Sequence, residues 1–143
     1  MPQSSSGTLA HAPIDVQWVG GLAFEAGRPQ GPRARIDGDA LSAPSPFDVL
    51  LAAIATCAAV DVLTILEKQR TPVQALNVRI EADRVDSTPR RLASAVLHFD
   101  ITAPSATIEK VTRAVELSVT KYCSVRSSLI ADASVTWEVT LKP

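Results

Sequence analysis

One stretch of the sequence decides the fold: Ser45-Pro-Phe-Asp-Val-Leu-Leu-Ala-Ala-Ile-Ala-Thr-Cys57-Ala-Ala-Val-Asp61-Val62. It opens with the pattern of a helix start. Ser45 can cap the free amides, Pro46 suits the first helical position, and Asp48 lies three residues after the cap. The residues that follow are almost entirely apolar. We therefore predict a helix that continues to about Lys68.

The first turns of this helix are apolar on nearly every side, so protein must surround them. A single chain of 143 residues can hardly supply that cover. We therefore predict a homodimer in which a second copy of the chain completes the burial. The uninterrupted apolar run is shorter than the roughly 20 residues that a membrane-spanning helix needs. This favours a core helix, not a membrane anchor.

Short strands are predicted before the helix. Residues 14–19 alternate between apolar and polar side chains, Gly20 and Gly21 offer a two-residue turn, and residues 22–26 continue as a return strand. Residues 34–36 look like a third short strand. We expect a small antiparallel meander.

The spacing of apolar residues predicts the strands and the helix that follow the long helix. Residues 76–84 and 93–101 alternate as two strands of a second hairpin, and residues 105–122 have the period of an amphipathic helix. A brief helical turn at residues 124–129 leads to a closing strand at residues 134–141. The order predicts an α+β fold, with antiparallel sheets around a long buried central helix.

Composition and charge indicate the domain organisation, the cellular compartment and the kinds of partner to expect. Residues 1–12 are rich in Ser, Gly and Ala without periodicity, which predicts a mobile arm before a single domain at residues 13–143. The amino terminus lacks the basic and apolar segments of a secretion signal, so we expect a cytoplasmic protein. With 14 basic and 15 acidic residues, the chain shows no electrostatic footprint for nucleic acid or an anionic membrane.

Cys57 and Cys123 are the only cysteines. In a reducing compartment a cysteine pair is more often redox-active or metal-binding than a structural bridge. Cys57 lies too deep in its helix for the helix dipole to activate it, and Asp61 on the same face opposes a thiolate. Cys123 has better local prospects, because it lies near the start of a helical turn and close to Lys121. Each cysteine could instead be an inert, buried thiol, and the local sequence favours this interpretation for Cys57.

If the fold brings the two thiols together, a redox cycle becomes possible. A thiolate attacks a peroxide oxygen, becomes a sulfenic acid and then condenses with the second thiol to a disulfide. Arg28, Arg33 and Arg35 form a cluster that could stabilise the thiolate or a substrate carboxylate, although such a cluster is more often a solvated loop.

Other kinds of chemistry find little support in the sequence. The two histidines, His11 and His98, lack the close spacing to other ligands that a metal site needs. The sequence also has no phosphate-binding loop, nucleophile elbow or dinucleotide fingerprint.

Two segments carry a resemblance to a known family. They contain Ser45-Pro46, Leu50-Leu51, Ala53, Cys57, Ala59, Asp61-Val62, Ile65-Leu66, Lys68 and Arg70, and later Lys121-Tyr122-Cys123-Ser124-Val125. With them, the chain resembles the OsmC/Ohr superfamily of osmotically inducible and organic hydroperoxide resistance proteins between about residues 16 and 139. The likeness is greatest to an OsmC-like branch with Asp four residues after the first cysteine.

The resemblance implies an intertwined homodimer with antiparallel sheets around two central helices and a site at each subunit interface. It also implies that Cys57 is the peroxidatic cysteine and Cys123 the resolving one. Organic hydroperoxides would be the substrates, and a lipoylated protein, another dithiol or small thiols would be the reductant. No metal or bound cofactor is implied.

The chain departs from the family at two positions. The characterised peroxidases have an Arg in the first hairpin and a Glu directly after the Pro that opens the central helix. Here the hairpin turn is Gly20-Gly21-Leu22, and Phe47 follows the proline. Arg33 or Arg35 could replace the missing cation.

Three hypotheses for function follow. The first is a thiol-dependent peroxidase of oxidative stress defence, in which Cys57 attacks an organic hydroperoxide and Cys123 resolves the product. The second is a non-catalytic binding protein that takes a small hydrophobic or sulfur-containing ligand into an apolar cleft. The third is a dimeric module in which the two cysteines only pack.

Overall fold

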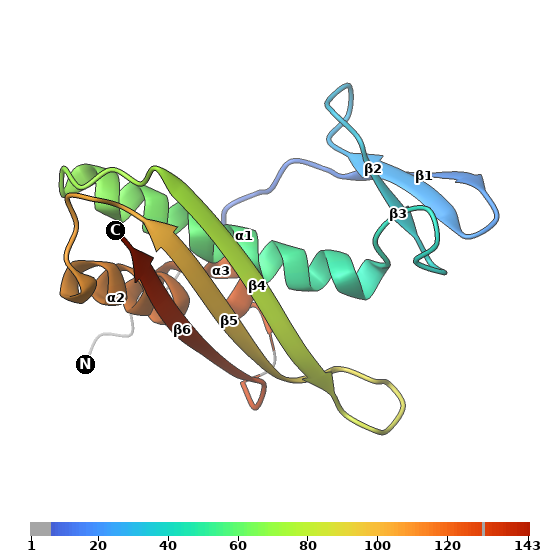
Figure 1. The fold of residues 1–143 in the computed structure, drawn as a ribbon. Coiled ribbons are helices and arrows are strands. Elements are labelled where there is room, and N and C mark those ends of the chain that lie inside the picture. The colour runs from blue at the N-terminus through green and yellow to red at the C-terminus, as the bar shows by residue number, and fades with distance from the viewer. Residues whose placement is uncertain (1–6, 130) are drawn as a thin grey trace. The chain divides into compact units, whose positions relative to one another are not determined.

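The structure is a computed structural model that describes residues 7–129 and 131–143. The chain forms two compact units, and the boundary between them along the sequence lies between Val49 and Leu50 (Figure 1). Of the arm predicted at residues 1–12, residues 1–6 lie outside the described part of the chain. Residues 7–14 form neither helix nor strand.

The N-terminal unit contains the predicted meander. Strands β1 (Asp15–Gly20), β2 (Ala23–Gly27) and β3 (Ala34–Asp37) pair antiparallel in that order. The β1–β2 turn lies one residue later than predicted, at residues 21–22. Gly20 and Gly21 have φ angles of 116° and 55°, which glycine adopts without steric cost.

Helix α1 (Pro46–Lys68) has the predicted bounds, and it crosses from the N-terminal into the C-terminal unit. Its start is a reciprocal cap. The amide of Asp48 donates to the Ser45 hydroxyl oxygen at 3.1 Å, and the amide of Ser45 donates to the Asp48 carboxylate at 2.9 Å. The predicted capping residues are therefore confirmed, and they satisfy two amides that the helix leaves free.

The sheet of the C-terminal unit corrects one prediction. Strands β4 (Ala75–Arg84) and β5 (Leu92–Thr102) are antiparallel, as predicted. However, β6 (Ser134–Lys142) lies parallel to β5, so the sheet is mixed in the order β4-β5-β6. A helical crossover separates β5 from β6, and it returns the chain to the end of the sheet where β5 began.

The crossover contains three short helical elements: α2 (Ile108–Leu117), the π-helix η1 (Ser118–Tyr122) and α3 (Ser124–Ser127). The predicted helix at residues 105–122 starts later because Thr107 caps it, accepting a hydrogen bond from the amide of Lys110 at 3.3 Å. Its last turn widens into η1.

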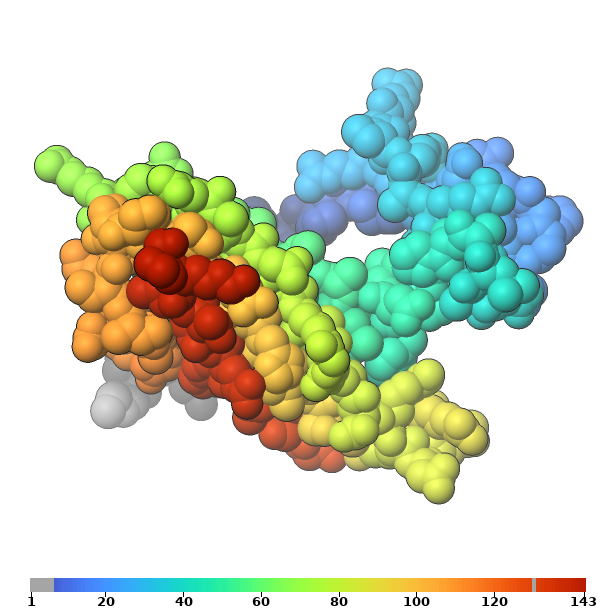
Figure 2. Space-filling model, in the orientation of Figure 1, coloured from blue at the N-terminus to red at the C-terminus, as the bar shows by residue number. Residues whose placement is uncertain are grey.

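Figure 1 shows α1 and α2 on one face of the β4–β5–β6 sheet, and Figure 2 shows these strands covering the front of the C-terminal unit. The core lies between the sheet and the helices. Its most buried large side chains come from α1, β5 and the crossover: Ile54, Val62, Leu66, Leu97, Phe99, Ile101, Val111, Val115 and Val119. This core holds α1 against the crossover, which carries Cys123.

Helix α1 also has an uncovered apolar side. Val60 is 59% exposed and Leu63 is 40% exposed. By length and composition alone, α1 could cross a membrane, but one such helix is weak evidence because the core helix of a soluble protein has the same composition. Five residues of α1 are buried inside the chain.

Removing the helix cap should destabilise the protein. We expect Ser45→Ala to lower the free energy of unfolding by about 1 kcal/mol, because the amide of Asp48 loses its acceptor. Urea unfolding followed by circular dichroism measures this loss. Ser105→Ala, at an exposed serine outside the helices and strands, is the control. Equal stability of the two variants would contradict the role of the cap.

Candidate thiol site

The fold brings Cys57 and Cys123 to one place in the C-terminal unit. The Cys57 sulfur lies 3.9 Å from the hydroxyl of Ser124, the residue after Cys123. The Cys123 sulfur lies 3.9 Å from the carbonyl oxygen of Ile54 on α1. Both cysteines are free thiols, Cys57 half-buried and Cys123 only 1% exposed. The condition for a shared dithiol site is therefore met.

The surroundings of Cys57 favour its thiolate. Burial raises the pKa of the Cys57 thiol, but hydrogen bonds outweigh this effect and hold the pKa below its ordinary value. The donors are the amide of Val125, the thiol of Cys123, and the hydroxyl and amide of Ser124. Donors to the charged form lower an acid's pKa because they stabilise the anion.

Cys123 has the opposite shift. Burial raises the pKa of its thiol, and the hydrogen bond to Cys57 and the charge of Cys57 raise it further. The amide of Arg126, which donates to the Cys123 sulfur at 3.4 Å, opposes this only in part. The sequence-based prediction that Cys123 has the better prospects of a thiolate is therefore wrong, and Cys57 is the thiol that ionises first.

The reason lies in the turn between η1 and α3. Cys123 has an extended backbone there, with φ −69° and ψ 99°, and acts as the N-cap of α3. The first amides of α3, those of Ser124 and Val125, then donate hydrogen bonds to the sulfur of Cys57 on α1. From the sequence, the start of this helical turn was expected to favour a thiolate on Cys123. Ser124 and Val125 were not identified as donors to Cys57.

Asp61 follows Cys57 by one helical turn. Burial raises the pKa of its carboxyl group, and its Oδ2 atom is buried without a hydrogen-bond partner among the described residues. Asp61 lines a cavity of about 450 Å³, together with residues of α1 and with Leu117 and Tyr122 of the crossover. The sequence placed Asp61 on the same helical face as Cys57, but it did not predict the cavity.

The arginine cluster lies in the N-terminal unit. Arg33 contacts Asp15, with 3.9 Å between the guanidinium and the carboxylate. Arg35 is on β3, opposite Glu25 of β2. The hypothesis that Arg33 or Arg35 replaces the family's cation stays a prediction.

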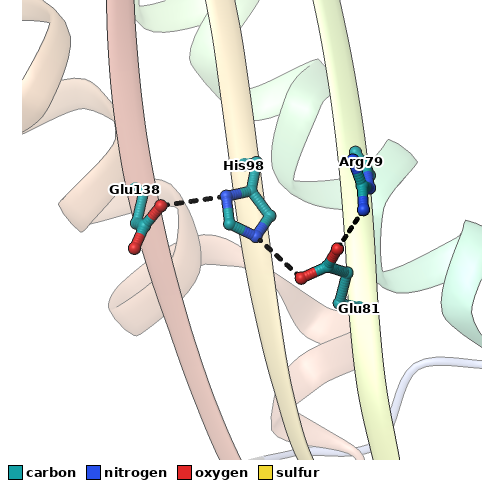
Figure 3. Close-up of polar contacts among 4 residues, drawn as sticks. All are labelled: Arg79, Glu81, His98 and Glu138. Atoms are coloured by element: carbon teal, nitrogen blue, oxygen red, sulfur yellow. Dashed lines mark hydrogen bonds and ion pairs between the residues drawn. The ribbon is translucent and has the colours of Figure 1, made fainter.

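A second cluster of ionisable groups crosses the outer face of the C-terminal sheet (Figure 3). The two ring nitrogens of His98 lie 3.3 Å from a Glu81 oxygen and 3.0 Å from a Glu138 oxygen. Arg79 pairs with the other oxygen of Glu81. Within the described residues no group of His, Cys, Asp or Glu could hold a metal ion. The contacts of His98 and Arg79 link strands β4, β5 and β6.

The arrangement at the thiols can perform two-electron redox chemistry. Hydrogen-bond donors lower the pKa of the Cys57 thiol, whereas burial raises the pKa of the neighbouring Cys123 thiol. This is the asymmetry that an attacking and a resolving cysteine need.

Comparisons with known proteins agree with this fold. The family model for OsmC-like proteins matches residues 37–139. The chain is 37% identical over 122 residues to protein YhfA of Escherichia coli K12, covering 85% of this chain and 91% of YhfA.

Two solved structures show the same fold at low identity. An OsmC-like protein from Mycoplasma pneumoniae has a TM-score of 0.79 and 16% identity, covering 94% of this chain and 99% of its own. The organic hydroperoxide resistance protein OsmC from Legionella pneumophila has a TM-score of 0.67 and 13% identity, with the same coverage, 94% and 99%. At these identities the likeness concerns the fold alone.

The different pKa values of the two thiols can be measured by alkylation. We expect iodoacetamide to modify Cys57 with a pH midpoint below that of an ordinary thiol, whereas the midpoint for Cys123 lies above it. Peptide mapping by mass spectrometry separates the two rates. Ser124→Ala should move the midpoint of Cys57 upward because one donor is lost. Faster alkylation of Cys123 than of Cys57 would contradict the assignment.

Proposed function

The chain belongs to the OsmC-like protein family, and we propose that it is a thiol-dependent peroxidase that reduces organic hydroperoxides. One observation carries this proposal: Cys57, with its pKa lowered, is hydrogen-bonded to Cys123, with its pKa raised. The name of the Legionella relative, an organic hydroperoxide resistance protein, supports the choice of substrate.

In the proposed first step, the Cys57 thiolate attacks the oxygen of the hydroperoxide that carries hydrogen. The O–O bond breaks, Cys57 becomes a sulfenic acid, and the organic oxygen leaves with the electron pair to become an alcohol after it gains a proton. The amide of Val125 and the Ser124 groups that donate to the thiolate keep the sulfur ionised for this attack.

The second step follows from the charge on Cys57. Part of the rise in the pKa of Cys123 comes from its hydrogen bond to Cys57 and from the negative charge there. The neutral sulfenic acid removes that charge, so the pKa of Cys123 falls once Cys57 has been oxidised. Cys123 then attacks the Cys57 sulfur, its proton leaves with the hydroxyl group as water, and a disulfide forms.

The third step regenerates both thiols. A dithiol, such as that of a lipoylated protein, or two small thiols would reduce the disulfide and be oxidised to a disulfide in turn. Cys57 is the more exposed of the two cysteines, so the incoming thiolate would attack its sulfur first.

We also propose that the active form is a homodimer. Val60 and Leu63 leave an apolar strip of α1 uncovered, and Val16 and Trp18 of β1 are each 64% exposed on one face of their strand. Soluble proteins seldom leave such apolar faces in water unless they bind a partner. A second copy of this chain is the occupant that the resemblance to the OsmC/Ohr superfamily implies.

The peroxidase proposal is tested by rapid mixing. We expect the wild type to consume cumene hydroperoxide quickly and to form a Cys57–Cys123 disulfide. Cys57→Ser should reduce the rate to that of the uncatalysed reaction, because the attacking thiolate is gone. Cys123→Ser should still react once and then stop at a sulfenic acid, which dimedone traps.

The outcome of this experiment separates the hypotheses. Consumption by the wild type at the background rate would overturn the peroxidase. If native mass spectrometry then found a small ligand bound, the non-catalytic binding protein would be favoured instead.

The dimer is tested by placing a charge on the uncovered strip of α1. Leu63→Asp should convert the protein to monomers, because the carboxylate would have to be buried at the interface without a partner. Sedimentation velocity measures the change. Leu41→Asp, at a leucine that is 87% exposed and outside α1, is the matched control. A monomeric wild type, or a Leu63→Asp variant that stays dimeric, would contradict the proposal.

A further inference from the structure

The cavity beside Asp61 has no part in the proposed redox cycle. It measures about 450 Å³, which is within the size range of small-molecule sites. Its walls come from the end of α1 and from the crossover, and they include Asp61, Ile65, Lys68, Leu117 and Tyr122. Neither cysteine is among the lining residues. The cavity is therefore a candidate binding site outside the thiol pair.

Asp61 contributes a carboxyl group whose burial is not offset inside the protein. Its Oδ2 atom is buried and has no hydrogen-bond partner among the described residues. None of the ion pairs found in the described part of the chain involves Asp61. Burial raises the pKa of this carboxyl group, as expected where no cation or donor stabilises its charge. A positively charged donor that enters the cavity would supply the missing stabilisation.

Lys68 contributes the opposite charge to the same wall. It is the last residue of α1 and follows Asp61 by two helical turns, or about 10 Å along the helix axis. The ion pairs among the described residues do not involve Lys68, with Asp61 or with any other carboxylate. The carboxyl group and the ammonium group can therefore each bind a separate part of one ligand.

The cavity also has apolar walls. Ile65 lies between Asp61 and Lys68 on one face of α1, because residues four and three apart on a helix are neighbours. Leu117 and the ring of Tyr122 line the cavity from the crossover. An apolar chain would bury its surface against these side chains while its two ends meet the two charged groups.

The pattern of charges disfavours other classes of ligand. A ligand with only an anionic group would be repelled by the carboxylate of Asp61, and one with only a cationic group would be repelled by Lys68. Within the part of the chain that the structure describes, no group of His, Cys, Asp or Glu could hold a metal ion. A ligand that carries both charges satisfies both ends of the cavity.

We propose that this cavity binds a small zwitterion. Its ammonium group pairs with Asp61, its carboxylate pairs with Lys68, and an apolar chain between them lies against Ile65 and Leu117. The binding is noncovalent and uses neither thiol. It is therefore independent of the proposed peroxidase function.

The test uses probes of one chain length that differ in charge. ε-Aminocaproate carries both charged groups, hexylamine carries only the ammonium group, and caproate carries only the carboxylate. Each is titrated into the full-length protein, and the amide chemical shifts in NMR spectra report both affinity and position. Asp61→Asn and Lys68→Gln each remove one charge. Glu67→Gln on α1 and Lys110→Gln on α2, at exposed residues outside the cavity wall, are the matched controls.

We expect ε-aminocaproate to shift the amides of the cavity wall and to bind about tenfold or more tighter than caproate, because a charge-assisted hydrogen bond is worth at least that factor. Asp61→Asn should weaken its binding by a similar factor. Lys68→Gln should weaken it less, because Lys68 is exposed to solvent. Glu67→Gln and Lys110→Gln should bind it as the wild type does.

One ratio does not depend on how well a variant folds. In Asp61→Asn the preference for ε-aminocaproate over caproate should disappear, and both affinities are measured on the same protein. The inference would be overturned by a wild type that binds caproate as tightly as ε-aminocaproate or binds neither. Shifts confined to residues away from the cavity wall would also overturn it.

Discussion

The site depends on one buried hydrogen bond between the crossover and the central helix. The hydroxyl of Ser118, at the first residue of η1, donates to the carbonyl of Ala58 on α1 at 2.6 Å. Ala58 directly follows Cys57, and η1 leads directly to Cys123. Because Ser118 is fully buried, its hydroxyl has little choice of partner, and an unpaired one would be costly. This bond holds the π-helical turn against α1 at the level of the thiols.

The same junction explains why two cysteines in one site behave differently. The π-helix ends at Tyr122, and Cys123 is both its C-cap and the N-cap of α3, so that the first backbone amides of α3 follow the cysteine immediately. These amides stabilise an anion on Cys57, which lies on the neighbouring helix, more than on Cys123. Cys123 is the more deeply buried of the two cysteines, and the pKa of its thiol is raised. The pKa of Cys57 is lowered by the amides of Val125 and Ser124, together with the Cys123 thiol and the Ser124 hydroxyl.

Much of the fold could be predicted from local patterns. The cap at Ser45 and Asp48 fixed the start of α1, and alternation identified the strands of both sheets. The direction of β6 could not be read in this way, because alternation is the same in parallel and antiparallel strands, and only the crossover decides it. The widened turn η1 was also missed, since its residues have the same apolar period as the end of α2.

The candidate site was predictable only in part. The resemblance to a family identified Cys57 and Cys123, but their relative acidity depends on contacts between segments far apart in the sequence. Asp61 was expected to oppose the thiolate, since a charge four residues away on a helix is a near neighbour. Its buried oxygen and the adjoining cavity become visible only when the crossover packs on α1.

The central claim is that Cys57 and Cys123 form a single redox unit within one chain. Intact-protein mass spectrometry after one equivalent of an organic hydroperoxide, followed by non-reducing peptide mapping, tests this most directly. The account predicts a mass loss of two hydrogens and one peptide pair joined through Cys57 and Cys123 of the same chain. Two thiols that remain free, or a disulfide formed only between different chains, would contradict it.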